Sequence, residues 1–186
     1  GMSREEMEKA TLDTLAANER NLEPGSMYRV GHWVTRGVDD ASMSAGSAKR
    51  ATVVIFWRPV DVGKIARNYE EGVRLAVTAT RRNPPECVET RAKVTSKMNQ
   101  ILAELDAAAS GSLSLMLDIH GNVAENSSAN FFIVRVGALW TPPERNVLQG
   151  VTRQAVFELA GRLGIPVEER NFTMYDVAQA QEYFIT

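Results

Sequence analysis

Three groups of residues in the second half of the 186-residue chain have the chemistry of a reactive site. Lys93 follows a turn-rich stretch and offers a primary amine, the nucleophile that forms Schiff bases with carbonyl compounds. Glu125 offers a carboxylate, which favours the charged form of a neighbouring basic nitrogen. Gly150, Val151 and Thr152 stand at a predicted helix start, where free N–H groups and the helix dipole favour an anion. An amine, a carboxylate and a helix start that favours an anion are thus the candidate chemical groups.

The composition excludes several other kinds of site and partner. Cys87 is the single cysteine, which rules out an internal disulfide and a zinc site built on several thiolates, so we expect no metal. His32 and His120 lie far apart, and neither has the context of a Ser-His-Asp hydrolase. The net charge of −2 argues against nucleic acid as a partner. No apolar run reaches about 18 residues, so we expect no membrane partner, and one thiol without an export signal predicts a cytoplasmic protein.

Strands and helices must position these residues. From residue 73 onward, turn residues separate the predicted strands and helices clearly. We predict strands at 73–80, 113–119, 130–136, 139–141, 165–169 and 182–186, and helices at 94–109, 151–163 and 174–180. In the helix at 94–109, one face carries an apolar stripe of Met98, Ile101, Leu102, Leu105 and Ala109, which predicts the side that packs on the core.

The first half of the chain has a weaker pattern. We predict a capped helix from Ser3 to about residue 21, a strand at 27–35, a polar loop at 37–49 and a helix at 61–71. The segment 51–57 is continuously apolar, which predicts a strand buried on both faces. A domain boundary is expected at residues 70–72. Because strands and helices mix without strict alternation, the predicted fold class is α+β.

Several short motifs follow one another between residues 82 and 184. They are Arg82-Asn-Pro84, Lys93, Leu117-Asp118-Ile-His-Gly121-Asn-Val123, Glu125-Asn-Ser127-Ser-Ala-Asn130-Phe131-Phe132, Leu139-Trp-Thr141, Leu148-Gln-Gly150-Val151-Thr152-Arg153, Gly164-Ile-Pro-Val167 and Glu182-Tyr-Phe184. In order, spacing and residue type they resemble the class IV family of pyridoxal-phosphate enzymes. That family contains branched-chain and D-amino-acid aminotransferases and aminodeoxychorismate lyase. The resemblance covers residues 27–186.

The resemblance implies a fold, a cofactor and a role for each matching residue. The fold would be that of D-amino-acid aminotransferase, fold type IV, with a remnant of the small domain at 1–70 and most of the large cofactor-binding domain at 71–186. The cofactor would be pyridoxal 5′-phosphate, held as a Schiff base on Lys93, which would then move the proton at the substrate's α-carbon. Glu125 would pair with the pyridinium nitrogen. Gly150, Val151 and Thr152 would bind the phosphate.

The substrate side of the site is less well defined by the sequence. Arg29, Arg36 and Ser127 are the candidates for contact with a small amino acid or a 2-oxo acid. Branched-chain enzymes carry a tyrosine five residues after the catalytic lysine, and D-amino-acid enzymes carry an apolar residue there. Met98 at this position points away from the branched-chain subgroup without excluding its activity. Lys97, one turn after Lys93, is expected to be solvated. A homodimer is implied by the resemblance alone.

Two departures from the family leave alternatives open. The chain lacks the first part of the small domain, and it stops after Thr186, before a phosphate-binding loop of the family, so it is expected to be a truncated piece of an enzyme. Besides transamination, a lyase-type β-elimination that releases pyruvate would use the same Lys93. A third possibility is a folded remnant or assembly module that binds no cofactor tightly, because each missing charge-assisted contact costs about 1.5–3 kcal/mol.

Overall fold

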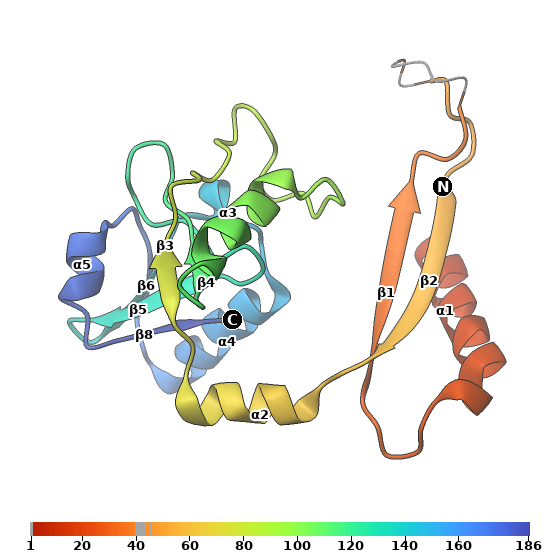
Figure 1. Cartoon of the computed structure of the whole chain (residues 1–186), viewed down its shortest axis with the longest axis horizontal. Helices are drawn as coiled ribbons and strands as arrows, with labels where there is room; N and C mark the ends of the chain where they lie inside the picture. Colours follow the sequence, from red (N-terminus) through yellow and green to blue (C-terminus); the bar gives the residue numbers. More distant parts are fainter. Residues whose placement is uncertain (1, 40–43, 45) are drawn as a thin grey trace. The chain divides into compact units, whose positions relative to one another are not determined.

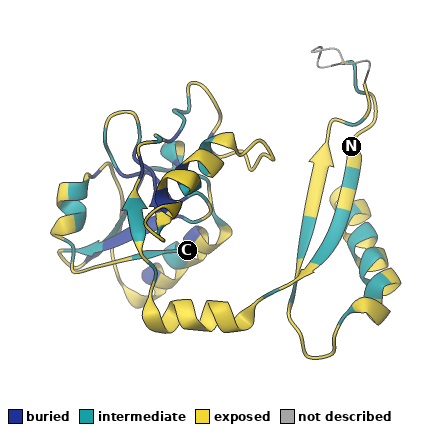
Figure 2. Cartoon of the chain, in the orientation of Figure 1, coloured by how far each residue is buried: buried dark blue, intermediate teal, exposed yellow. Residues whose placement is uncertain are grey.

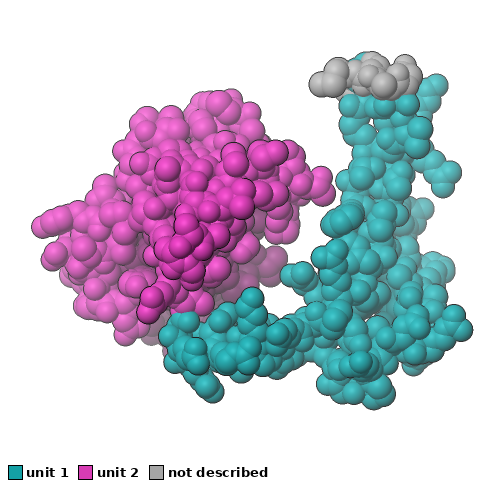
Figure 3. Space-filling model, viewed as in Figure 1, with its two compact units in different colours: residues 1–72 teal, residues 73–186 magenta. Residues whose placement is uncertain are grey.

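The computed structural model describes residues 2–39, 44 and 46–186. The chain divides into two compact units, Gly1–Gly72 and Val73–Thr186, which Figure 3 colours separately. The division falls at Gly72, which ends a helix, next to the boundary expected at residues 70–72. The identity of the units as parts of a small and a large domain stays a prediction. None of the helices in the described residues combines the length and apolarity needed to cross a bilayer.

The first unit consists of two strands that form one antiparallel pair, together with short helices (Figure 1). Its elements are α1 (Arg4–Asn18), the 3₁₀ helix η1 (Glu19–Asn21), β1 (Tyr28–Thr35), β2 (Thr52–Pro59) and α2 (Val62–Glu71). The helix α1 starts with the predicted capping box, in which Ser3 and Glu6 bind each other's backbone N–H groups. The strands β1 and β2 are antiparallel, and α1 packs against β2.

The prediction that segment 51–57 is buried on both faces is wrong. β2 pairs with β1 alone, and its residues are partly or fully exposed. Of the residues described in the first unit, none is buried, as Figure 2 shows. A two-stranded hairpin with one helix offers too few apolar faces to enclose a strand. Of the predicted loop at 37–49, residues 40–43 and 45 lie outside the described residues.

The second unit contains the buried core and mixes helices with two sheets, which confirms the α+β class. In chain order its elements are β3 (Leu75–Val77), α3 (Met98–Ala108), β4 (Leu113–Leu115), β5 (Phe131–Arg135), β6 (Ala138–Thr141), η2 (Glu144–Asn146), α4 (Val151–Leu163), β7 (Val167–Glu169), α5 (Met174–Ala178) and β8 (Glu182–Ile185). β3 and β4 are parallel, and the four-stranded sheet has the order β7-β6-β5-β8.

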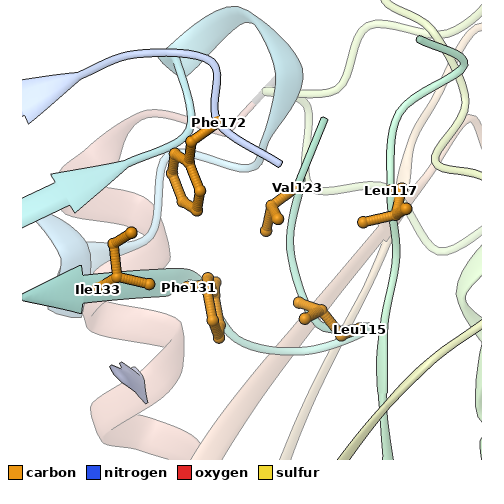
Figure 4. Close-up of a cluster of buried hydrophobic side chains, with 6 residues drawn as sticks. All are labelled: Leu115, Leu117, Val123, Phe131, Ile133 and Phe172. Carbon is orange, nitrogen blue, oxygen red and sulfur yellow. The ribbon is translucent and has the colours of Figure 1, made fainter. Parts of the chain in front are cut away.

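The core of the second unit lies between β4, β5 and the segment that precedes α5. Figure 4 shows the buried side chains that form it, which are Leu115, Leu117, Val123, Phe131, Ile133 and Phe172. β5 also sends Phe132 to its opposite face, where the ring stacks on Phe184 and meets Phe157 of α4 edge-on. Phe131, Phe132 and Ile133 are therefore at most 1% exposed, so β5 is the strand that is buried on both faces.

Several strands are shorter than the sequence predicts. β3 covers only residues 75–77 of the predicted 73–80. The predicted strand 113–119 ends as β4 at Leu115, and a single bridge then joins Leu117 to Val123. Between them the chain turns at Gly121, whose φ of +86° favours glycine. The helix α4 and strand β6 match the predicted ranges to within one residue.

The predicted packing of the helix at 94–109 is also wrong. The helix α3 begins at Met98, and the stripe of Met98, Ile101, Leu102 and Leu105 is 45–66% exposed. The residues that α3 buries are Ala103 and Ala107, whose small side chains let the helix lie close to β3 and β4. The periodicity identified one face of the helix correctly, but within this unit that face points away from the core.

Candidate functional site

Glu125 lies at the centre of the candidate site and forms a buried ion pair with Arg82. The Arg82 Nε donates to Glu125 Oε1 at 2.8 Å, and both side chains are 6% exposed. Glu125 stands just after Val123 and Ala124, two buried residues that return from the turn at Gly121. Arg82 lies in the segment after β3, where its own N–H donates to the Leu117 carbonyl at 2.9 Å. Burying either charge alone would be costly, so each fixes the other.

The second oxygen of Glu125 connects the carboxylate to the entry of α4. Glu125 Oε2 accepts from the backbone N–H of Leu148 at 3.0 Å and from Asn130 Nδ2 at 3.2 Å. A carboxylate has about four acceptor positions. In the described part of the chain, three hydrogen bonds reach this carboxylate, one of them from Arg82. One acceptor position therefore remains for a further donor.

The ionisation of Glu125 depends on two opposing influences. Burial raises the pKa of Glu125 above its ordinary value. The positive charge of Arg82 and the Leu148 N–H oppose that rise in the pKa, as does the positive charge of Lys93. The charge of Lys93 thus acts on Glu125 although the two residues are 32 positions apart in sequence (125 − 93).

Lys93 projects from a tight turn rather than from a helix. The N–H of Val94 donates to the Ala92 carbonyl at 3.0 Å, which places Lys93 at the centre of a three-residue turn. Three residues earlier, the Thr90 hydroxyl donates to the Arg145 carbonyl at 2.6 Å, and Thr90 is 1% exposed. This buried anchor holds a segment in which Lys93 itself is exposed. The amine is accessible to a small molecule while its backbone is held.

The start of α4 supplies the predicted anion-binding groups. Gly150 is the N-cap, and Val151 and Thr152 are the first two helical residues, both exposed. Gly150 has no side chain that could bind the first N–H groups of the helix, which therefore face outward to a ligand or to water. The backbone N–H of Leu148, which binds Glu125, lies only two residues before Gly150. The Glu125 carboxylate and the start of α4 are thus joined by a short, hydrogen-bonded segment.

Gly150 is required at this position by the close approach of Asn130. A Cβ built on Gly150 would lie 2.2 Å from Asn130 Oδ1. The amide of Asn130 is fixed, because its Nδ2 donates to the Leu148 carbonyl at 2.8 Å as well as to Glu125. Asn130 therefore holds the loop before α4 against β5.

The predicted substrate contacts are distributed over both units. Arg29 is exposed on β1, and Arg36 follows β1, where it donates to the Ser47 hydroxyl at 2.7 Å and pairs with Asp39. Ser127 is in the second unit and donates its hydroxyl to Glu104. A role in substrate binding for any of the three stays a prediction.

The polar residues that connect α3 to the candidate site by hydrogen bonds were not predicted from the sequence. Glu104 Oε1 accepts from the Ser114 hydroxyl at 2.7 Å and also from Ser127, and Asn126 Nδ2 lies 3.5 Å away. Although burial raises the pKa of Glu104, the hydrogen bonds from Ser127 and Ser114 outweigh it and lower the pKa below the ordinary value. Glu104 thus ties α3 to the segment directly after Glu125.

Two further polar residues of α3 bind the segment that carries Arg82. Asp106 accepts from the Thr80 N–H at 3.0 Å and from the Thr80 hydroxyl at 2.7 Å. Asn99 binds the backbone of both Arg81 and Asn83. The only sequence signal for these contacts is that Asn99, Glu104 and Asp106 lie off the apolar stripe, a position that ordinarily predicts exposure to solvent.

No candidate metal centre competes with this site in the described part of the chain. Among the described residues, His, Cys, Asp and Glu side chains form no group of three that could hold a metal ion. A hollow of about 560 Å³ lies between α1 and β2, and its lining includes no residue of the candidate site.

The chain is similar over its whole length to aminotransferases. The Amino-transferase class IV family matches residues 1–186. A putative branched-chain-amino-acid aminotransferase of Methanocaldococcus jannaschii is 33% identical over 189 residues, which cover 100% of this chain and 62% of that protein. A D-alanine aminotransferase of Listeria innocua is 30% identical over 188 residues, which cover 96% of this chain and 60% of that protein.

Solved structures show the same similarity in three dimensions. The branched-chain aminotransferase of Thermoproteus uzoniensis, solved with norvaline, superposes with a TM-score of 0.80 and 33% sequence identity, and the match covers 100% of this chain and 60% of that chain. Another branched-chain amino acid aminotransferase with this fold was solved with pyridoxamine 5′-phosphate, and it superposes with a TM-score of 0.81. The chain spans about three fifths of the length of these relatives.

Proposed function

Because the chain belongs to the Amino-transferase class IV family, we propose that the protein transfers the amino group of a small amino acid to a 2-oxo acid with pyridoxal 5′-phosphate as cofactor. One observation carries the proposal. The buried carboxylate of Glu125 pairs with Arg82 and is hydrogen-bonded to the loop that starts α4. An amine, a carboxylate and an anion site are the three groups that this cofactor needs, and they belong to one compact unit.

The residues present fit the cofactor at both of its ends. Glu125 keeps one acceptor position beyond its bonds to Arg82, Asn130 and Leu148, which suits the N–H of a protonated pyridine ring. The start of α4 has a glycine cap and two exposed residues, Val151 and Thr152, whose backbone N–H groups have no partner within the helix, which suits the phosphate. The Thr152 hydroxyl adds a further donor for the phosphate.

The cofactor, when bound, supplies an aldehyde that captures amines and a ring that withdraws electrons from the substrate's α-carbon. Glu125 holds the proton on the ring nitrogen, because a carboxylate beside a basic nitrogen favours its charged form. Arg82 keeps Glu125 ionised and oriented in its buried position. The Lys93 amine acts first as a general base, which takes the proton from the substrate's α-carbon. It then acts as a general acid, which delivers the proton to the cofactor's C4′ atom.

The proposed amino donor is a branched-chain or a D-amino acid. Support comes from relatives of both kinds, a branched-chain enzyme and a D-alanine enzyme, at similar identity. The residue five positions after Lys93 is Met98, which begins α3 and is 66% exposed. A panel of L-leucine, L-valine and D-alanine as donors, each with a 2-oxo acid acceptor, separates the two classes.

Chemical labelling of the lysine tests the function. Borohydride reduction of the protein with pyridoxal phosphate, followed by peptide mass spectrometry, is expected to place the pyridoxyl group on Lys93. Lys93→Ala should abolish the label, while Lys97→Ala, which removes an exposed lysine four residues later, should keep it. Equal labelling of Lys93 and Lys97, or none, contradicts the proposal and favours a folded remnant that binds no cofactor tightly.

Product analysis then separates transamination from β-elimination. Transamination requires the 2-oxo acid acceptor and consumes it in proportion to the donor. Release of pyruvate from an aminodeoxychorismate-like compound without an acceptor would instead indicate the lyase reaction. Glu125→Gln should lower the rate of either reaction by about a hundredfold or more while leaving the label on Lys93, because the amide cannot favour a charged ring nitrogen.

Self-association into a homodimer is part of the same proposal. Its support is the apolar stripe of α3, of which Met98 and Leu105 are 66% and 65% exposed. Contiguous exposed apolar surface favours association between proteins. Light scattering of the purified chain measures the assembly state, and Leu105→Glu should shift the population towards the monomer.

A further inference from the structure

Asn99 binds the main chain on both sides of Arg82. Its Nδ2 donates to the Arg81 carbonyl at 2.7 Å, and its Oδ1 accepts from the Asn83 N–H at 3.1 Å. The side-chain amide thus spans the two peptide groups that flank Arg82, using one donor and one acceptor. Asn99 is the second residue of α3, so this segment is clamped to the start of the helix.

The clamp determines where the guanidinium of Arg82 lies. Arg82 is 6% exposed, and its Nε reaches Glu125 Oε1 at 2.8 Å. The backbone N–H of Arg82 donates to the Leu117 carbonyl at 2.9 Å. That bond fixes one point of the backbone, whereas Asn99 fixes the peptide groups before and after it. Together they set the direction from which the arginine approaches the carboxylate.

The same helix start lies close in sequence to the lysine. Lys93 precedes α3 by five residues, and the intervening segment 94–97 is not helical. A shift of the first turn of α3 would therefore move the Lys93 segment and the Arg82 segment together. Asn99 is a direct side-chain connection between the helix start and the Arg82 segment.

We infer that Asn99 is a positioning residue that holds Arg82 against Glu125 and so fixes where the proposed ring-binding carboxylate lies relative to Lys93. The role of this position in cofactor binding rests on the proposed function. The link from Asn99 through Arg82 to Glu125 exists in the protein without cofactor. Two cations act on the Glu125 carboxylate, Arg82 directly and Lys93 at longer range. Loss of the Asn99 hydrogen bonds should weaken the effect of Arg82 on Glu125 and leave the effect of Lys93 unchanged.

The test measures the ion pair in the cofactor-free full chain by NMR. The readouts are the Arg82 Nε–H signal, which the buried bond to Glu125 protects from exchange, and the pH titration of the Glu125 carboxyl carbon. Asn99→Ala is expected to speed exchange of the Nε–H and to move the pKa of Glu125 further upward. Gln100→Ala, which removes an amide from the next residue of the same helix turn, should change neither readout.

The outcomes separate positioning from general stabilisation. If Asn99→Ala lowers the melting temperature but leaves both signals unchanged, or if Gln100→Ala moves them equally, the inference is wrong. If Asn99→Ala does not fold, Asn99→Asp decides, since it keeps the acceptor for Asn83 and loses the donor to Arg81. It should move both signals in the same direction, and an unchanged Arg82–Glu125 pair in that variant would overturn the inference.

Cofactor binding provides a second measurement that tests the proposed function separately. Asn99→Ala should weaken binding of pyridoxal phosphate by about tenfold, the equivalent of one lost hydrogen bond of typical strength. Gln100→Ala should bind like the parent chain. If the parent chain binds no cofactor, the proposed function fails, while the NMR result still decides whether Asn99 positions Arg82. If the NMR signals move but binding does not change, Asn99 positions Arg82, and the part of the inference that links this position to the cofactor site is wrong.

Discussion

Arg82 and Glu125 form a buried ion pair at 2.8 Å although 43 positions of sequence separate them. The pair joins the segment after β3 to the segment before β5, and Glu125 continues the connection to the loop that starts α4. A charge buried to this degree is stable only with a partner. The ion pair therefore fixes the geometry of the candidate site, and the stability of the second unit depends on the pair.

Removal of Arg82 alone should be strongly destabilising. Arg82→Met leaves the Glu125 carboxylate buried without its nearest cation, at a cost of about 3–5 kcal/mol in the free energy of unfolding. The double variant Arg82→Met/Glu125→Leu should regain most of that loss, because it removes both charges. Urea unfolding followed by amide NMR signals of residues 73–186 measures all three proteins. A single variant as stable as the parent would show that the pair is not needed.

The close approach of Asn130 predicts opposite effects of two glycine substitutions in and next to α4. Gly150→Ala would place a Cβ 2.2 Å from Asn130 Oδ1 and should destabilise the protein by about 1–3 kcal/mol. Gly161→Ala lies inside the same helix, has no heavy atom within 4 Å of its Cβ, and should stabilise by about 0.5–1 kcal/mol. Thermal unfolding of the two variants gives the sign of each change. A neutral Gly150→Ala would mean that Asn130 can move away.

The lowered pKa of Glu104 predicts part of the acid sensitivity of the second unit. A folded-state pKa below the ordinary 4.5 stabilises the ionised form, so the contribution is complete above pH 4.5 and is lost as the pH falls through the lower value. Glu104→Gln should therefore reduce stability at neutral pH by about 1–3 kcal/mol and flatten its decline in acid. Glu125 acts with the opposite sign, because its pKa is raised.

Urea titrations at a series of pH values compare Glu104→Gln with the parent chain. Glu158→Gln, at an exposed position of α4, controls for the change in net charge. Parallel stability curves for Glu104→Gln and the parent would contradict the assignment of the acid response to Glu104.

The two faces of α3 predict a contrast between a small inner residue and a large outer one. Ala103 is fully buried, so Ala103→Leu should overpack the contact with β3 and β4 and cost about 1–3 kcal/mol. Leu105 is 65% exposed, so Leu105→Gln should change the free energy of unfolding by about 0.5 kcal/mol or less. Equilibrium unfolding of the monomeric chain at low concentration distinguishes them. The reverse order of effects would restore the original prediction that the apolar stripe packs on the core.

Local sequence predicted elements well where the signal was local. The capping box of Ser3 and Glu6 set the start of α1, and Gly150 and Gly164 bounded α4 at the predicted residues. Such signals act within a few residues of themselves and need no knowledge of neighbours. The larger errors concern burial. Segment 51–57 is as apolar as β5, but only β5 has partners on both sides and side-chain cover on both faces.

The same contrast between local signals and tertiary contacts applies to the candidate site. The sequence by itself determined which groups can do the chemistry, because Lys93, Glu125 and Gly150 are defined by residue type and by motif spacing. Only the tertiary structure decided that Arg82 is the partner of Glu125, that Asn130 excludes any side chain at Gly150, and that α3 contributes Asn99 and Glu104. These relations join segments far apart in sequence, and a hydrogen bond or a close contact is fixed by distance in space, which local pattern does not encode.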